Sequence, residues 1–223
     1  LLLHNHEVVV FDFNTSIVSD LEKKGAIAAS DIEDMIQKLP DTKIVWLMVP
    51  AGKPVDDTIT KLLPMLQKGD ILIDGGNSFW KDSQARAART AFKGVEYIDC
   101  GTSGGVWGLQ NGYCLMYGGN EQTCNSLDPI FSSLATEGGY LYCGNSGAGH
   151  FVKMVHNGIE YGMMQAFAEG FELMEKSPFA PDLDKVAELW RHGSVVRSWL
   201  LDLIKNALDQ DPKLDKLSAY VED

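Results

Sequence analysis

The chain has no cluster of lysine or arginine residues and no long hydrophobic run. Its 223 residues include 31 acidic and 19 basic side chains, for a formal net charge of −12. Because binding to a phosphate backbone requires clustered cations, this balance argues against nucleic acid as a partner. No apolar stretch reaches the roughly 18 residues of a spanning helix, and no cleaved secretion signal is evident. The sequence therefore predicts a soluble protein without a membrane partner.

Cysteine and histidine are too scattered to suggest a metal centre. Cys100, Cys114, Cys124 and Cys143 include no Cys-x-x-Cys pair, and no HExxH motif occurs. Two disulfide bridges would be conceivable in a secreted protein, but the missing signal argues against them. We therefore predict no metal site, reduced cysteines and a cytoplasmic location.

The first half of the chain alternates short β-rich runs with helical stretches. Strands are predicted at 7–11, 44–49, 70–74 and 96–99, and helices at 15–24, 56–67 and 83–92. Apolar strands separated by helices are typical of a parallel α/β sheet. Ligands of such sheets bind at the carboxyl ends of the strands.

The second half changes from strands to helices. Glycine-rich loops and short strands end with a run at 140–144, and helical patterns follow over about 150–176, 183–191 and 194–209. We expect a doubly wound, Rossmann-like cofactor-binding domain over 1–147. The first part of an all-helical domain should follow over 148–223.

The glycine-rich turn of dinucleotide-binding folds is missing. The pattern Gly-x-Gly-x-x-Gly occurs nowhere in the sequence. Residues 1–6 resemble the end of a helix that leads into a strand. We expect that the first βα unit is absent from this chain, and that the end at 220–223, without a glycine or proline stop, is a truncation too.

A run at 149–165 places reactive side chains at helical spacing. Lys153, His156, Asn157, Glu160 and Tyr161 fall at i, i+3, i+4, i+7 and i+8, which is one face of a helix. The lysine and the acid would lie roughly 10 Å apart, with room for a small polar substrate between a base and an acid. A solvated helix face is the alternative. The Gly-Ala-Gly stretch directly before the helix favours a site, because it allows close approach of backbone or ligand.

Asp12 follows the first predicted strand. At the end of the second strand of a dinucleotide fold, an acid accepts hydrogen bonds from the adenosine ribose and repels a 2′-phosphate. This position predicts NAD rather than NADP. An acid that caps the next turn or helix is an equal alternative.

Small-residue turns follow two other predicted strands, at 49–52 and 74–78. Because both lie at strand carboxyl ends, they are candidates for cofactor contacts, although ordinary tight turns use the same residues. The segment 101–105, Gly-Thr-Ser-Gly-Gly, could present N–H groups and the Ser103 hydroxyl to an anion, or form a structural turn. Arg191 and Arg197 are candidates for phosphate binding, because a guanidinium can bind a phosphate through two hydrogen bonds. Surface ion pairs are the alternative for both residues.

With these residues placed, the chain resembles the decarboxylating 6-phosphogluconate dehydrogenases, specifically the short bacterial type that uses NAD, within the β-hydroxyacid dehydrogenase superfamily. The resemblance covers nearly all of the sequence. It is most specific at IDGGNS (73–78), GTSGGVWGLQNGYCLMYGG (101–119), GAGHFVKMVHNGIEYGMMQ (147–165) and WRHGSVVRSWLL (190–201).

The resemblance implies a reaction and two catalytic residues. Lys153 would take the proton of the substrate's 3-hydroxyl as hydride leaves C3 for the nicotinamide. The 3-keto acid would then lose CO₂, and Glu160 would protonate C1 of the enediol to give ribulose 5-phosphate.

The resemblance also assigns binding residues. Ser103, Gly104 and Gly105 would bind the substrate carboxylate. His156 and Asn157 would bind the substrate hydroxyls. Tyr161 and Arg197 would bind the substrate phosphate. Asn77 would contact both substrate and cofactor, and the cofactor would also contact Asp12, Val49 and Ala51.

Family members are homodimers or larger homo-oligomers, and a carboxyl-terminal tail of a second subunit completes their substrate pocket. We therefore expect these 223 residues alone to be inactive. Two alternatives stay open. One is another β-hydroxyacid dehydrogenase, such as one for 3-hydroxyisobutyrate, which would not need Glu160 as a second acid. The other is a catalytically silent fragment or homologue.

Overall fold

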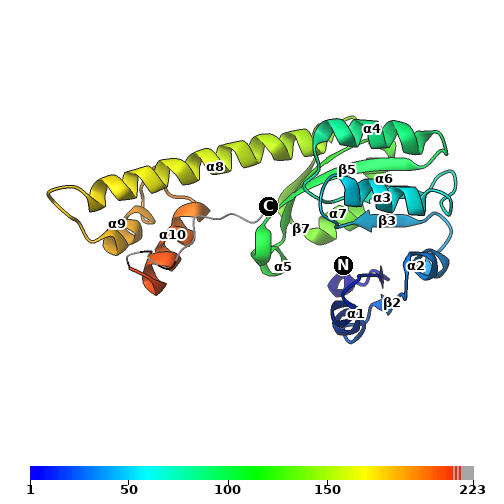
Figure 1. Cartoon of the computed structure of the whole chain (residues 1–223), viewed down its shortest axis with the longest axis horizontal. Helices are drawn as coiled ribbons and strands as arrows, with labels where there is room; N and C mark the ends of the chain where they lie inside the picture. Colours follow the sequence, from blue (N-terminus) through cyan, green and yellow to red (C-terminus); the bar gives the residue numbers. More distant parts are fainter. Residues whose placement is uncertain (213, 215, 217–223) are drawn as a thin grey trace. The chain divides into compact units, whose positions relative to one another are not determined.

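The computed structural model describes residues 1–212, 214 and 216 (Figure 1). It contains two compact units, Leu1–Val155 and His156–Asp223. The long helix α8 (Ala148–Glu175) begins in the first unit and ends in the second. The predicted division after Gly147 lies directly before this helix and stays a prediction.

A five-stranded sheet forms the centre of the first unit. Its strands lie in the order β3 (Ile44–Leu47), β4 (Ile71–Asp74), β5 (Glu96–Ser103), β6 (Tyr113–Gly118) and β7 (Ala135–Gly144). All neighbours are parallel except β5 and β6. The predicted α/β sheet is confirmed. The chain reverses at β6 because residues 104–112 are too few for a parallel crossover, which needs roughly a dozen or more.

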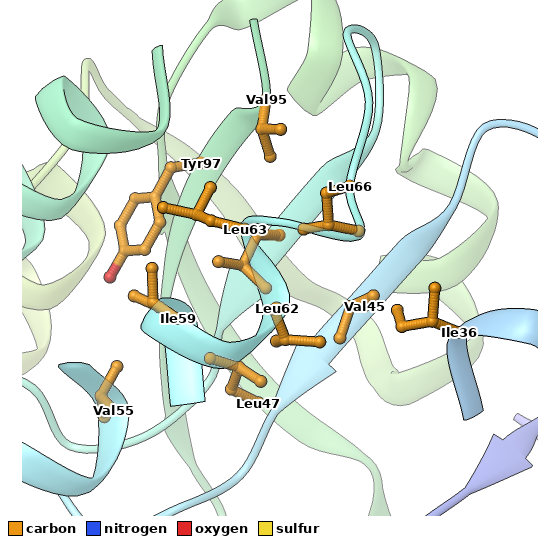
Figure 2. Packing of buried hydrophobic residues seen from close by; sticks show 11 residues of the cluster. Ile36, Val45, Leu47, Val55, Ile59, Leu62, Leu63, Leu66, Val95 and Tyr97 are labelled. Atoms are coloured by element: carbon orange, nitrogen blue, oxygen red, sulfur yellow. The ribbon is translucent and has the colours of Figure 1, made fainter. Parts of the chain in front are cut away.

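One face of the sheet packs against α3 (Lys53–Leu62), which connects β3 to β4. Val55, Ile59 and Leu62 occur at i, i+4 and i+7 and are each 0% exposed. They lie with Val45 and Leu47 of β3 in one cluster (Figure 2). Helix α4 (Trp80–Ala91) connects β4 to β5 and contacts β5.

Alternate residues of the same strands form a second cluster with α6 (Glu121–Ser126) and α7 (Asp128–Leu134). Ile71 and Ile73 of β4 belong to this cluster, whereas Leu72 belongs to the first. This alternation follows from the two-residue period of a strand. Apolar residues on both faces explain why the strands appear as nearly continuous apolar runs in the sequence.

Phe131 of α7 is a sensitive test of the second cluster. Its ring is 0% exposed and stacks on Tyr117 with 4.1 Å between ring centroids. We expect Phe131→Ala to lower the free energy of unfolding by about 3–5 kcal/mol, because it removes buried area and leaves a cavity. Urea unfolding measures this change. The control is Phe92→Ala, since that side chain is 93% exposed and its loss should cost less than about 0.5 kcal/mol. Equal losses for both variants would contradict the packing described.

The amino-terminal residues form a small layer of their own. Strands β1 (Val9–Val10) and β2 (Ile27–Ala28) pair in parallel as a two-stranded sheet. Around them lie η1 (Leu2–His4), α1 (Thr15–Glu22) and α2 (Ile32–Lys38). The strand predicted over 7–11 is therefore shorter in the structure. Asn14 is the N-cap of α1, because its side-chain oxygen accepts a hydrogen bond from the Ser16 amide at 3.1 Å.

The second unit consists of the later part of α8 with α9 (Leu183–Trp190) and α10 (Trp199–Gln210). Their common core contains Phe171, Ala187, Leu201 and Leu208. The prediction of a helix from residue 194 is wrong, because α10 begins at Trp199. Ser198 caps it, since the hydroxyl accepts a hydrogen bond from the Leu201 amide at 3.2 Å. Among the residues described, no helix is both long and apolar enough to cross a membrane.

Candidate active site

The carboxyl ends of β3 and β4 bring two predicted turns together. The strands pair in register with Leu47 opposite Asp74, so the segments that follow each strand begin side by side. The Gly75 amide donates to the Leu47 carbonyl at 2.9 Å. Val49 lies half-buried in the first turn, and Ala51 and Asn77 are exposed. The structure thus places three of the predicted cofactor and substrate residues at one edge of the sheet.

Two glycines make close contacts where these turns meet. A β-carbon on Gly75 would lie 2.0 Å from Nε1 of Trp46 and 2.7 Å from Sδ of Met48. At Gly76 it would lie 3.0 Å from the carbonyl oxygen of Val49. The missing β-carbons therefore let the Trp46 and Met48 side chains pack on Gly75 and let the Val49 carbonyl approach Gly76.

A buried arginine links the same two turns. The Arg86 side chain is 3% exposed, and its Nε donates to Asp56 at 2.8 Å. One terminal nitrogen donates to Asp74 at 3.2 Å and to Ser78 Oγ at 3.1 Å, and the other donates to the Gly52 carbonyl at 3.1 Å. Burial by itself lowers the pKa of Arg86, but the Asp56 hydrogen bond and nearby charges outweigh it and raise the pKa. Arg86 therefore stays charged and holds both turns.

Lys153 lies on α8, next to the strand that leads to the Ser-Gly-Gly loop. A β-carbon on Gly101 would lie only 2.3 Å from the Lys153 β-carbon, so the lysine stem passes directly over this glycine. Two residues later β5 ends at Ser103, which is followed by Gly104 and Gly105. Lys153 and Ser103 are both half-buried. The structure thus brings the predicted base to the strand that carries the predicted carboxylate loop.

Asp99 is a residue that the sequence prediction missed. It lies in β5, is 0% exposed, and its carboxylate accepts hydrogen bonds from the Gly147 amide at 2.6 Å and the His150 amide at 2.9 Å. Burial raises the pKa of Asp99, and these two hydrogen bonds oppose the rise. An acid within the apolar run Tyr-Ile-Asp-Cys was the available signal.

In the second unit, α8 presents His156, Asn157 and Glu160 close together. His156 Nδ1 lies 3.1 Å from Asn157 Oδ1 and 3.7 Å from Glu160 Oε2. Tyr161 follows on the same helix and is exposed. The helix predicted from the spacing is confirmed, and it contains Lys153 as well as these four residues. The chemical roles of all five stay predictions.

Arg197 lies in the segment between α9 and α10. With Arg191, His192, Gly193 and Asp202 it lines a cavity of about 350 Å³. Arg191 pairs with Asp202 at 2.7 Å and with Glu188 at 2.8 Å, and these hydrogen bonds raise its pKa. The surface ion pair considered for Arg191 is therefore present.

Asp12 lies in the exposed segment after β1. Its Oδ1 accepts a hydrogen bond from the Asn14 amide at 2.7 Å, which is the turn-capping role considered for it. This contact uses one carboxylate oxygen, and the ribose contact stays a prediction. Within residues 1–212, 214 and 216, no group of three or more His, Cys, Asp or Glu side chains is arranged to hold a metal ion.

Two family models match the chain in sequence order. A model described as the NAD binding domain of 6-phosphogluconate dehydrogenase matches residues 1–149. The 6-phosphogluconate dehydrogenase C-terminal domain matches residues 149–181. Together with the parallel sheet and the helices that follow it, these matches define a dehydrogenase that uses a nicotinamide dinucleotide. The chain belongs to the 6-phosphogluconate dehydrogenase family.

Individual relatives agree with this family. YqeC of Bacillus subtilis is 46% identical, over 97% of this chain and 73% of YqeC. The NAD(+)-dependent, decarboxylating 6-phosphogluconate dehydrogenase of Haloferax volcanii is 44% identical, over 92% of this chain and 68% of its own length. The 6-phosphogluconate dehydrogenase of Plasmodium falciparum, solved with NADP+ and with 6-phosphogluconate, superimposes with a TM-score of 0.84 at 30% identity. That alignment covers 96% of this chain and 47% of the Plasmodium chain.

The fold is shared more widely. A Mycobacterium tuberculosis 3-hydroxyisobutyrate dehydrogenase superimposes with a TM-score of 0.75 at 24% identity. The alignment covers 89% of this chain and 66% of that one. This likeness concerns the fold alone.

Proposed function

We propose that this protein oxidises and decarboxylates 6-phosphogluconate to ribulose 5-phosphate and CO₂, with NAD as the preferred cofactor. The observation that carries the proposal is the placement of Lys153, which packs on Gly101 just before the Ser103 to Gly105 loop. The same helix, α8, also carries the acid Glu160, seven residues after Lys153. Reduction of a nicotinamide needs only the base. Conversion of the enediol that decarboxylation leaves into a ketone needs an acid for carbon as well.

In the proposed mechanism Lys153 takes the proton of the 3-hydroxyl. A bound nicotinamide would supply the acceptor for the hydride that leaves C3. The resulting 3-keto acid loses its carboxyl group as CO₂, while protonated Lys153 donates to the C3 carbonyl oxygen to give the enediol. Glu160 then protonates the carbon that becomes C1 of ribulose 5-phosphate, and the enediol hydroxyl returns its proton to Lys153.

The remaining residues have binding roles in this proposal. Backbone amides at Gly104 and Gly105 and the Ser103 hydroxyl suit the carboxylate, because N–H and O–H donors bind anions. His156 and Asn157 bind hydroxyls, and Tyr161 and Arg197 bind the phosphate, for which a guanidinium is well suited.

The cofactor is assigned to the strand ends. Val49, Ala51 and Asn77 are the proposed cofactor contacts there, Asn77 also facing the substrate, and Asp12 holds the ribose. Residues 1–147 then form the cofactor-binding domain, and residues 148–223 belong to the helical domain. A cytoplasmic homodimer or larger homo-oligomer completes the proposal, on the resemblance to the family.

The test follows reduced-cofactor absorbance with the full-length gene product. 6-Phosphogluconate and 3-hydroxyisobutyrate are offered in parallel, each with NAD and with NADP. Turnover of 6-phosphogluconate with release of CO₂ is the expected result. Oxidation of 3-hydroxyisobutyrate instead would move the protein to a related hydroxyacid dehydrogenase, and no turnover with either acid would favour a silent homologue.

Asp12 decides the cofactor preference in this proposal. We expect Asp12→Ser to shift the ratio of kcat/KM for NADP over NAD by about tenfold or more toward NADP, because the carboxylate no longer repels the 2′-phosphate. Steady-state kinetics with both cofactors measure the ratio. The control is Asp20→Ser, which removes an exposed acid of α1 that pairs with Lys23. If both variants keep the parent ratio, Asp12 acts only as a cap of its turn.

A further inference from the structure

We propose that Asp99, together with the Ser83–His150 pair, is a positioning residue for Lys153. It fixes the first turn of α8 on the sheet, so that the lysine stays over Gly101, two residues before the Ser103 to Gly105 loop. The proposal rests on the role of Lys153 proposed above. Asp99, Ser83, His150 and Lys153 all belong to the compact unit Leu1–Val155.

The hydrogen bonds of Asp99 are those that a helix start requires. Gly147 precedes α8 and His150 is its third residue. The amides of these two positions have no partner within a helix, and a capping box normally satisfies them from the helix's own side chains. Gly147 has no side chain. Here one carboxylate from β5 accepts both, at 2.6 and 2.9 Å. Its charge at the amino-terminal end of α8 is also favourable toward the helix dipole.

Three glycines bring the helix backbone directly onto the strands. We call Gly101, Gly118 and Gly149 the glycine contact. A β-carbon on Gly149 would lie 2.4 Å from the carbonyl oxygen of Met116 and 2.6 Å from that of Asp99. On Gly118 it would lie 2.9 Å from the Gly149 amide, and on Gly101 2.3 Å from the Lys153 β-carbon. At Gly118 and Gly149 the helix and the strands therefore meet backbone to backbone, and at Gly101 the Lys153 stem packs directly on the strand.

A second tether holds the same turn from α4. Ser83 Oγ lies 2.7 Å from Nδ1 of His150, and both residues are buried, at 0% and 2% exposure. The His150 amide also donates a hydrogen bond to Asp99. The backbone of His150 is therefore fixed by β5, and its side chain by α4.

This anchoring has a chemical consequence. Lys153 follows His150 by three residues, so a shift of the first turn moves the lysine amine by a comparable distance. A displacement of about 1 Å at a reacting group can lower a rate by about 100-fold. A residue that touches neither substrate nor cofactor can therefore control the rate through the position of the base.

The test compares Asp99→Asn with a matched control, Asp70→Asn. Asp70 is also buried, at 3% exposure, and its carboxylate also accepts two amide hydrogen bonds, from Lys43 and Gln67, both at 2.8 Å. It precedes β4, at the opposite end of that strand from the site. Each substitution replaces one accepting oxygen by an NH₂ group that faces an amide. Both should cost similar stability.

For Asp99→Asn in the full-length protein we expect kcat with 6-phosphogluconate to fall about 10- to 100-fold, with the KM for NAD within about twofold of the parent value. Asp70→Asn should keep kcat within about twofold. Ser83→Ala is a milder change and should lower kcat about threefold. If Asp99→Asn does not fold, this variant decides, and an unchanged kcat in Ser83→Ala would then contradict the proposal. An unchanged kcat in the folded variant, or equal losses in Asp99→Asn and Asp70→Asn, would overturn the proposal.

Amide hydrogen exchange of the peptide over 148–153 separates this proposal from the proposed function. Exchange should be faster in Asp99→Asn than in Asp70→Asn, whether or not the parent protein turns over 6-phosphogluconate. If the parent protein is inactive, the proposed reaction is wrong, and the hydrogen-exchange comparison alone decides whether Asp99 anchors α8. Identical exchange in the two variants would refute the anchoring itself.

Discussion

Replacing Lys153 by methionine is expected to lower kcat with 6-phosphogluconate by about 10³- to 10⁴-fold, because the proton of the 3-hydroxyl then has no base. Methionine is unbranched like the lysine stem, so it can pack over Gly101 in the same way. The site should therefore keep its shape. We expect the dissociation constant of 6-phosphogluconate to change by less than about fivefold, since the carboxylate and phosphate contacts are retained.

Two measurements check this prediction. Steady-state kinetics give kcat, and isothermal titration gives the substrate dissociation constant. Lys61→Met is the control, because Lys61 is an exposed lysine on α3 and its loss should leave both quantities unchanged. Turnover of Lys153→Met near the parent rate would remove Lys153 from the role of base, whatever the binding result.

Replacing Glu160 by glutamine is expected to lower kcat by about 10²- to 10³-fold, since an amide cannot deliver a proton to the enediol carbon. Glutamine keeps the length of the side chain near His156, whose Nδ1 lies 3.7 Å from Glu160 Oε2. The lost step concerns carbon, so it has a specific signature. In D₂O the parent enzyme should exchange a C1 proton of ribulose 5-phosphate for deuterium, and the variant should not.

Proton NMR of ribulose 5-phosphate during incubation follows this exchange. Glu169→Gln on the same helix is the matched control, because Glu169 is exposed and accepts a hydrogen bond from Gln165 at 2.8 Å. It should exchange like the parent. If Glu160→Gln also exchanges at the parent rate, another group supplies the proton and the decarboxylating assignment loses its second acid.

The sequence predicts this protein best where function depends on local spacing. The stripe from Lys153 to Tyr161 lies within nine positions, and the helical period alone places it on one face, as α8 confirms. Apolar runs likewise predict β3 and β4, because both faces of the sheet are covered. Here the information that decides the structure lies in adjacent residues.

Prediction fails where distant segments decide the structure, and also where a local element is very short or its start competes with a neighbouring pattern. Asp99 and its partner Gly147 are 48 positions apart, and only the folded sheet brings them together. Strand β2 contains two residues, too few for a period to be visible. The start of α10 depends on one hydroxyl at Ser198, which competes with the helical pattern of the preceding residues. Asp99 and Ser198 do have local signals, an acid within an apolar run and a hydroxyl before a helix, but these signals do not identify the groups that the side chains contact.

The residues of the glycine contact, which hold Lys153 in position, are different from the residues proposed to bind the substrate. Gly149 of α8 packs on the backbone of the strands at Gly118, and the Lys153 stem packs on Gly101, so these contacts depend on the absence of β-carbons. Substitutions at His156 or Tyr161, which are proposed to bind the substrate, leave every residue of the glycine contact unchanged. A change of substrate specificity through such substitutions would therefore start from a helix that is still anchored on β5 and β6.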